Sequence, residues 1–413
     1  MDTESEKRNL LLIIVTCTAY AITYLARLSF AANITAIATE LNASNDQLGM
    51  VSSFLFFAYG GCQILNFFVA KRYSLTYTVP VALTVSGLCN FLLTVTENVD
   101  LMKAIWLVNG LFQGVIWCNV LNVQVRFLSA EGIKKCVLWG GLSYCIGTFA
   151  VYGLSALLIN VNYKITFYII TALCLGISAV WIFTVKSAYK NAPAQKDASA
   201  QTPSPDPRGK NVFTGYFLLP FALFVAAAFF NAFLRDGIMT WLPSVLKDSF
   251  SLDDSVAVLI TMGLTLLCAA GIFLARFLGV RAKSLSLLMC SSFTATLVLA
   301  GASAVFYKGG LPLPFVAAFG IMICLVYSNV NVISSQMPFR LKKYTNTGGI
   351  AALFDAFCYS GSTAATYLLG LISKNGNWLP FITAVGTVAA IGALLSATGG
   401  ILAKKDPLSS ELL

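Results

Sequence analysis

The sequence predicts an all-α integral membrane protein with twelve transmembrane helices in two six-helix bundles and both termini in the cytoplasm. Of its 413 residues, 58% are hydrophobic and only 11% are charged, whereas soluble domains have about 25% charged residues. The apolar residues also come in blocks of about 20 or more, the helix length that crosses the ~30 Å hydrocarbon core of a bilayer. These observations exclude an ordinary soluble enzyme.

Twelve candidate spans appear when the chain is divided at charged or Pro/Gly-rich interruptions. In chain order they cover residues 11–38, 47–70, 75–96, 101–128, 137–160, 165–185, 212–246, 255–278, 285–307, 311–337, 347–373 and 379–402. The first span contains Tyr20, Tyr24 and Arg27, and it is too long and polar for a cleaved signal peptide. We therefore expect this span to remain in the mature protein.

The basic residues set the orientation of the spans. With the N-terminus inside, twenty of the 27 Lys and Arg residues fall in the tails and loops of the inner side, and five fall in the outer loops. By the positive-inside rule both termini are cytoplasmic. This topology accounts for the net charge of +10 without a nucleic-acid partner. Two arginines, Arg27 and Arg235, remain inside apolar spans.

The residue inventory also limits the chemistry. The sequence has no histidine, so the usual zinc ligand and the commonest general base are both missing. Its eleven cysteines form no C-x-x-C pair and lie mostly inside the spans, where cysteine behaves as a small buried hydrophobe. We therefore expect no catalytic residue, no metal site and no cofactor.

A polar segment divides the chain into two halves. Residues 186–210 hold four prolines and many small polar side chains, a composition typical of a flexible linker. We predict an N-terminal bundle at 1–185, a cytoplasmic linker at 186–211 and a C-terminal bundle at 212–413. Arg27 and Arg235 stand 208 residues apart at matching places in the two halves, as expected for a transporter made of parallel repeats.

The two intramembrane arginines are the main candidates for a binding site. An arginine inside a lipid-facing helix costs at least about 2.5–3.5 kcal/mol, so it normally faces a cavity or a partner. We expect one arginine from each half to converge on a central anion, because a guanidinium binds phosphate or carboxylate through two parallel hydrogen bonds. The alternative is ion pairing with Asp236 or Asp355. Adjacent side chains on a helix diverge by about 100°, so Asp236 is not expected to satisfy Arg235.

Polar and aromatic residues at helical spacing accompany these arginines. Tyr20, Tyr24 and Arg27 share one helical face, and pairs separated by four residues recur on other spans. Each pair alone is equally typical of helix packing, but their repetition favours a polar lining between the halves. The pairs are Tyr59 with Gln63, Gln113 with Trp117, and Asp355 with Tyr359.

At these positions the sequence resembles the organophosphate:phosphate antiporter family of the major facilitator superfamily. The resemblance covers essentially the whole chain and is most specific in two motifs. They are Tyr20-x-x-x-Tyr24-x-x-Arg27-x-x-Phe30 in the first span and Leu234-Arg235-x-Gly237-Ile238-x-x-Trp241-x-Pro243-x-x-Leu246 in the seventh. The resemblance implies that Arg27 and Arg235 bind a phosphoryl group, and that Tyr59, Gln113, Trp117 and Tyr327 line the cavity.

The chain departs from the family pattern at several positions. Leu28 and Gln63 stand where the family has lysine, and Ser143 stands where it has histidine. Asp236 replaces an aromatic residue, and Asp355 adds a carboxylate. The cavity is therefore expected to be less positive than that of the family. This favours a singly charged anion, a carboxylate, or a phosphodiester or zwitterion whose cationic end could meet Asp236 or Asp355, over a doubly charged phosphate monoester.

Together these features predict a monomeric secondary transporter of the plasma (inner) membrane, with a small anionic substrate and inorganic phosphate or a proton as the coupling species. The predicted substrate-binding residues are Arg27, Arg235, Tyr20, Tyr24, Tyr59, Gln63, Trp117, Ser143 and Tyr327, with Asp236 and Asp355 as coupling or ion-pair candidates. Two other functions remain open at this point. One is a proton-coupled carrier of a carboxylate or zwitterion, and the other is a transporter-like membrane sensor.

Overall fold

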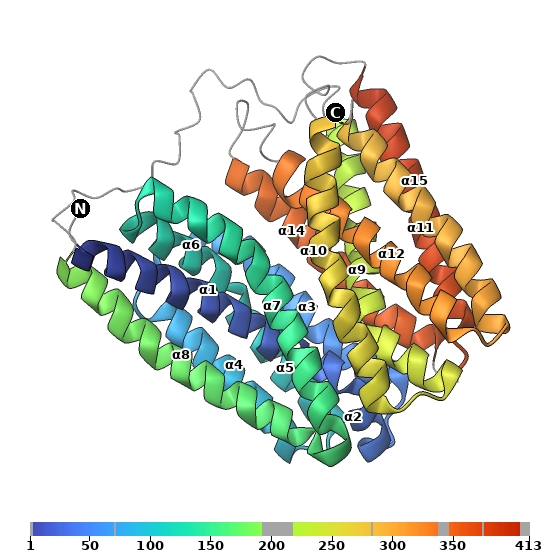
Figure 1. Cartoon of the computed structure of the whole chain (residues 1–413), viewed down its shortest axis with the longest axis horizontal. Coiled ribbons are helices and arrows are strands. Elements are labelled where there is room, and N and C mark those ends of the chain that lie inside the picture. The colour runs from blue at the N-terminus through green and yellow to red at the C-terminus, as the bar shows by residue number, and fades with distance from the viewer. Residues whose placement is uncertain are drawn as a thin grey trace.

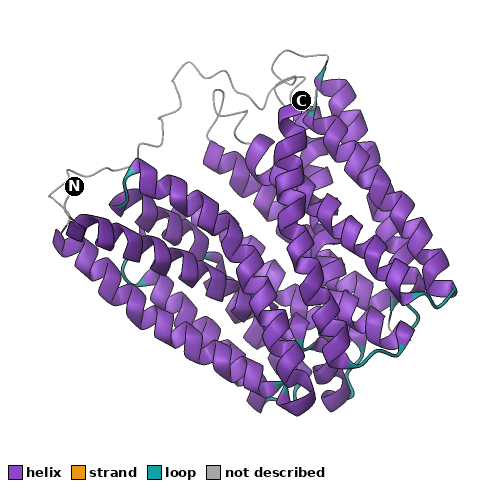
Figure 2. Ribbon diagram, viewed as in Figure 1, coloured by secondary structure: helices purple, strands orange, loops and turns teal. Residues whose placement is uncertain are grey.

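The computed structural model describes residues 3–69, 72–191, 218–281, 284–337, 347–373 and 376–404. Within these ranges the chain is helical almost throughout and contains no strand (Figure 2). Eleven stretches are long and apolar enough to cross a membrane, and α14 (Thr347–Ile372) is a further long helix between two of them. The predicted all-α membrane fold is confirmed, and eleven of the described helices meet the criteria of length and apolarity for a span, against twelve predicted.

The N-terminal half contains six spanning segments and one short helix. Its elements are α1 (Thr3–Ala32), α2 (Ile34–Leu41), α3 (Asn45–Val69), α4 (Thr78–Val95), α5 (Val99–Gly114), α6 (Ile116–Phe127), α7 (Ala130–Asn162) and α8 (Lys164–Asn191). The fourth span is broken at Val115 into α5 and α6. At this break Gly114 packs on α3, where a Cβ would lie 2.6 Å from the Cβ of Cys62.

The C-terminal half repeats the same pattern. Its elements are α9 (Leu218–Phe250), α10 (Asp254–Arg281), α11 (Leu285–Lys308), α12 (Pro312–Asn331), the π-helical turn η3 (Val332–Gln336), α14 (Thr347–Ile372) and α15 (Leu379–Ala403). Helix α8 continues to Asn191, beyond the predicted start of the linker at 186. The remainder of that linker lies outside the described residues.

The two halves lean together as a V in Figure 1, with α3 and α7 facing α14 and α10. Contacts between the halves gather at one end of the molecule, where α3 begins and α7 ends, which we call the closed end. Here Asn45 donates a hydrogen bond of 3.1 Å to the carbonyl of Ser373, and Asn160 donates one of 3.1 Å to Ser255. These bonds tie the ends of α3 and α7 to the opposite half.

Close helix packing continues from the closed end toward the middle of the interface. A Cβ on Gly49 of α3 would lie 2.4 Å from the carbonyl oxygen of Thr366 on α14. Further along, a Cβ on Gly60 would lie 3.0 Å from the Cβ of Tyr359. Only glycine allows backbones to approach this closely. The α3–α14 contact therefore brings Tyr359 of the C-terminal half directly against the N-terminal half.

Candidate functional site

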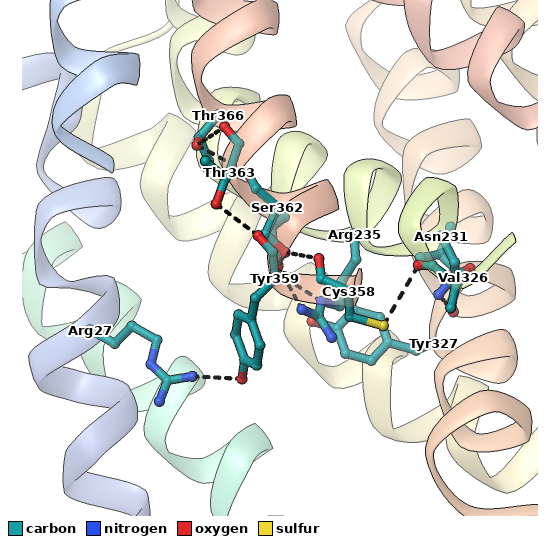
Figure 3. Close-up of polar contacts among 12 residues, drawn as sticks. Arg27, Asn231, Arg235, Val326, Tyr327, Cys358, Tyr359, Ser362, Thr363 and Thr366 are labelled. Atoms are coloured by element: carbon teal, nitrogen blue, oxygen red, sulfur yellow. Dashed lines mark hydrogen bonds and ion pairs between the residues drawn. The ribbon is translucent and has the colours of Figure 1, made fainter. Parts of the chain in front are cut away.

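Arg27 lies at the centre of a polar cluster between the halves. Its side chain is buried, with 7% of the residue exposed. Its Nε donates to Gln113 Oε1 at 3.0 Å, and its Nη1 donates to the hydroxyl of Tyr359 at 3.4 Å, across the interface in Figure 3. Both acceptors are neutral. Among the residues that the structure describes, no carboxylate pairs with Arg27.

Aromatic rings surround the Arg27 guanidinium. Its Cζ lies 4.2 Å from the ring centroid of Tyr59 and 5.0 Å from that of Tyr24. The Tyr59 ring in turn packs 4.2 Å from the ring of Tyr359. A desolvated cation over an aromatic face gains about 2 kcal/mol. The rings therefore stabilise the charge of Arg27 without neutralising it.

The other predicted aromatic residues extend the cluster along α1. The hydroxyls of Tyr20 and Tyr24 are 3.0 Å apart, and the Trp117 ring packs 4.3 Å from the ring of Tyr20. Tyr327 of α12 hydrogen-bonds through its hydroxyl to the hydroxyl of Tyr144 on α7. The predicted tyrosines and Trp117 therefore form one continuous cluster that spans both halves.

Arg235 occupies the other side of the site and has a different environment. Its Nε donates to Asp236 Oδ1 at 2.9 Å and its Nη2 donates to Asp236 Oδ2 at 2.6 Å. Ser362 of α14 also donates to Asp236 Oδ2. The expectation that neighbouring side chains on a helix could not satisfy one another was therefore wrong. The 100° rule applies to the directions of the Cβ atoms, whereas the long arginine side chain folds back to reach the adjacent carboxylate.

Asp355 forms no ion pair with either arginine among the described residues. It lies on α14 one turn before Tyr359 and is partly exposed. Arg235 is close enough to act on it electrostatically, but within the described part of the chain Asp355 forms no ion pair. The sequence offered Asp355 as the partner of an arginine, and in this structure Asp236 takes that place.

Two predicted site residues contact other groups. The side-chain amide oxygen of Gln63 accepts a hydrogen bond of 3.5 Å from the side chain of Asn66. The Ser143 hydroxyl lies within hydrogen-bond distance of the backbone carbonyl oxygens of Cys17, at 3.0 Å, and Trp139, at 2.8 Å, to which it donates. The Ser143 hydroxyl therefore links α7 to α1, and no contact in the described structure joins either residue to Arg27.

Four residues outside the predicted set complete the site: Gln113, Tyr144, Tyr359 and Ser362. Gln113 and Tyr359 were recognisable as members of the spaced pairs, but only the packing shows that both contact Arg27. Gln113 is itself oriented, since its amide donates to Ser86 at 2.9 Å and to Asn109 at 3.0 Å. Tyr144 and Ser362 carried no signal in the sequence, because their partners lie in the opposite half or on another helix.

Long apolar helices on both sides of an interface that holds intramembrane charges are the architecture typical of secondary membrane transporters. The chain belongs to the Major Facilitator Superfamily, whose sequence profile matches residues 16–366. The relatives named below are transport proteins and not enzymes.

Two curated relatives share moderate sequence similarity with the chain. The glycerol-3-phosphate transporter of Bacillus subtilis (strain 168) is 27% identical over 406 residues, covering 92% of this chain and 89% of that protein. A "probable hexose phosphate transport protein" of Chlamydia pneumoniae is 26% identical over 166 residues. The second match spans 40% of this chain and 36% of the relative.

Solved structures share the fold at lower identity. The nucleoside transporter NupG superposes with a TM-score of 0.68 at 16% identity, covering 96% of this chain and 98% of that chain. A D-xylose-proton symporter superposes with a TM-score of 0.68 at 13% identity, with 98% of each chain covered. At these identities the superpositions establish the fold alone.

Proposed function

We propose that the chain carries a small organic anion across the plasma membrane by alternating access, with a phosphorylated metabolite as the substrate and inorganic phosphate as the exchanged anion. The observation that carries this proposal is Arg27, a buried guanidinium between the two halves with only neutral partners. The similarity to a glycerol-3-phosphate transporter over 92% of the chain supports a phosphoryl group as the anion.

Arg27 is suited to hold an anion because its charge is buried and its hydrogen-bond partners are neutral. Hydrogen bonds to Gln113 and Tyr359 occupy two donors of a guanidinium that has five. The remaining donors can bind a phosphate or carboxylate through two parallel hydrogen bonds. The surrounding tyrosine hydroxyls supply further donors for the same anion.

The arrangement of the halves supports alternating access. The contacts at the closed end join α3 to α14 and α7 to α10, whereas Figure 1 shows the halves diverging toward the chain termini. With both termini cytoplasmic, as the distribution of basic residues indicates, this is an inward-facing conformation. We take residues 1–185 and 212–413 as the two units that rock about the site, and 186–211 as the linker between them.

The proposal is tested by counterflow in proteoliposomes that contain the purified chain. Unlabelled phosphate is placed inside and labelled phosphate outside, and a panel of phosphate esters and carboxylates is added as competitors. We expect labelled phosphate to accumulate and a phosphate ester to block its uptake. Absence of exchange in folded protein would contradict the proposal. Uptake that requires a pH gradient would instead favour a proton-coupled carrier, for which the unpaired Asp355 is the candidate proton site.

A further inference from the structure

The four intramembrane charges at the site are arranged unequally. Arg27 and Arg235 are matched in number by Asp236 and Asp355, so the formal charges cancel. Within the described residues only Arg235 and Asp236 are paired with each other. One positive and one negative charge therefore remain, and they lie on opposite halves of the protein.

The Arg235–Asp236 pair is largely self-contained. Both carboxylate oxygens accept hydrogen bonds from the guanidinium, at 2.9 and 2.6 Å, and the Ser362 hydroxyl supplies a third donor. The two side chains are 18% and 14% exposed. An anion that approached Arg235 would have to compete with a carboxylate already in bidentate contact. Arg27 is consequently the free cation of the site.

Asp355 is the free anion. It lies on the part of α14 that packs on α3, since a Cβ on Gly60 would lie 3.9 Å from the carbonyl oxygen of Ala356 and 3.0 Å from the Cβ of Tyr359. Arg235 is near enough to act on it electrostatically, but among the described residues the two form no ion pair, and the Cys118 thiol of α6 is an uncharged neighbour. An unpaired carboxylate inside a membrane protein is costly and normally functional. A cationic ligand group is the partner that would offset this cost.

Tyr359 connects the two free charges. Its hydroxyl accepts from Arg27 at 3.4 Å, and it follows Asp355 by one helical turn, a rise of about 6 Å. The Tyr59 ring lies 4.2 Å from the Tyr359 ring and 4.2 Å from the guanidinium carbon of Arg27. Aromatic faces attract ammonium groups as well as guanidinium groups. Tyr359 thus places Arg27 and Asp355 on the two sides of one side chain, where a ligand with an anionic and a cationic end would meet both charges.

We propose that the substrate is a zwitterion, namely an organophosphate that also carries an ammonium group, with its phosphoryl group on Arg27 and its ammonium on Asp355. This inference rests on the proposed function and specifies its substrate class. It gives Asp355, which forms no ion pair among the described residues, a cationic partner, and it matches the charge balance of the site.

A matched pair of ligands tests the inference. 2-Aminoethyl phosphate and propyl phosphate differ only by an ammonium in place of a methyl group. Both are tested as competitors of labelled phosphate counterflow at pH 7. We expect 2-aminoethyl phosphate to inhibit at a concentration at least about tenfold lower than propyl phosphate does. A tenfold ratio is what one well-placed ion pair supports. In Asp355→Asn the ratio should fall to about one, whereas Asp355→Glu should retain the preference.

Control variants and alternative outcomes separate this inference from the proposed function. Asp100→Asn, which removes an exposed carboxylate in the first turn of α5, should keep the wild-type ratio. Equal inhibition of the wild type by both ligands would overturn the inference and leave phosphate exchange intact. Persistence of the preference in folded Asp355→Asn would also overturn it. Failure of wild-type protein to exchange phosphate or respond to either ester would contradict the proposed function itself.

Discussion

Replacing Asp236 with Asn should convert Arg235 from a paired residue into a second anion-binding group. In the structure two charge-assisted hydrogen bonds, at 2.9 and 2.6 Å, hold Arg235 to Asp236. Such bonds contribute about 1.5–3 kcal/mol each. Asparagine keeps one acceptor oxygen and removes the charge, so about one of these bonds and the competition from a carboxylate are lost. An anion that takes the vacated position should then bind more tightly.

The expected gain in affinity follows from that difference. Release of about 1.5–3 kcal/mol corresponds to phosphate binding about 10- to 100-fold tighter. The lower end is more realistic, because the Arg235 side chain is 18% exposed and part of its charge is screened. Without ligand the variant should be less stable than the wild type, since removing one partner of a buried pair leaves an uncompensated charge.

Thermal unfolding of the detergent-purified protein measures both effects. Wild type, Asp236→Asn and the exposed control Asp100→Asn are melted across a phosphate titration. Asp236→Asn should start from the lowest melting temperature and show the largest rise, half-saturating at a phosphate concentration at least about tenfold below that of the wild type. Equal or weaker phosphate binding by Asp236→Asn would refute the idea that Asp236 occupies Arg235.

Two further substitutions test the environment of Arg27 and the closed end. Gln113→Glu places a carboxylate at the 3.0 Å contact with Arg27, so phosphate counterflow should fall about tenfold or more. Undiminished counterflow in a folded Gln113→Glu variant would contradict the idea that Arg27 must lack a carboxylate partner to bind the anion. Gly49→Ala would put a Cβ 2.4 Å from a backbone oxygen of α14, at a cost of about 1–3 kcal/mol. Faster hydrogen exchange at the facing ends of α3 and α14 should result, whereas Gly176→Ala, which meets no atom within 4 Å, should leave it unchanged. Unaltered exchange in Gly49→Ala would show that these helices do not close the interface.

The fold could be predicted largely from the sequence because membrane insertion imposes a simple rule. Each span must be long, apolar and helical, so composition and spacing locate the segments. The helix breaks were not predicted. The interruption at Val115 depends on the approach of Gly114 to Cys62 on a neighbouring helix, and a hydropathy pattern does not contain that contact.

The site was predictable in part for a similar reason. An intramembrane arginine is conspicuous in any sequence, and Tyr20 and Tyr24 share the helical face of Arg27 by spacing alone. The partners of the arginines were not evident. Gln113 and Tyr359 reach Arg27 from two other helices, and their choice depends on tertiary packing.

Arg235 shows a second reason why the site could not be fully predicted from the sequence. The helical spacing rule describes the directions of Cβ atoms and neglects the flexibility of a side chain with four rotatable bonds. Arg235 therefore pairs with its immediate neighbour Asp236, although the rule separates them. This local pairing changes the interpretation of the site, because it makes the two pseudo-symmetric arginines chemically unequal.

The proposed transport function depends most directly on Arg27 as the residue that binds the transported anion. The decisive measurement compares labelled phosphate counterflow by wild type, Arg27→Lys and Arg126→Lys at equal amounts of folded protein in proteoliposomes. Lysine keeps the charge but cannot form two parallel hydrogen bonds to an anion. We predict that Arg27→Lys loses most of the exchange, whereas Arg126→Lys, an exposed change near the end of α6, retains it. Wild-type exchange by Arg27→Lys would contradict the account.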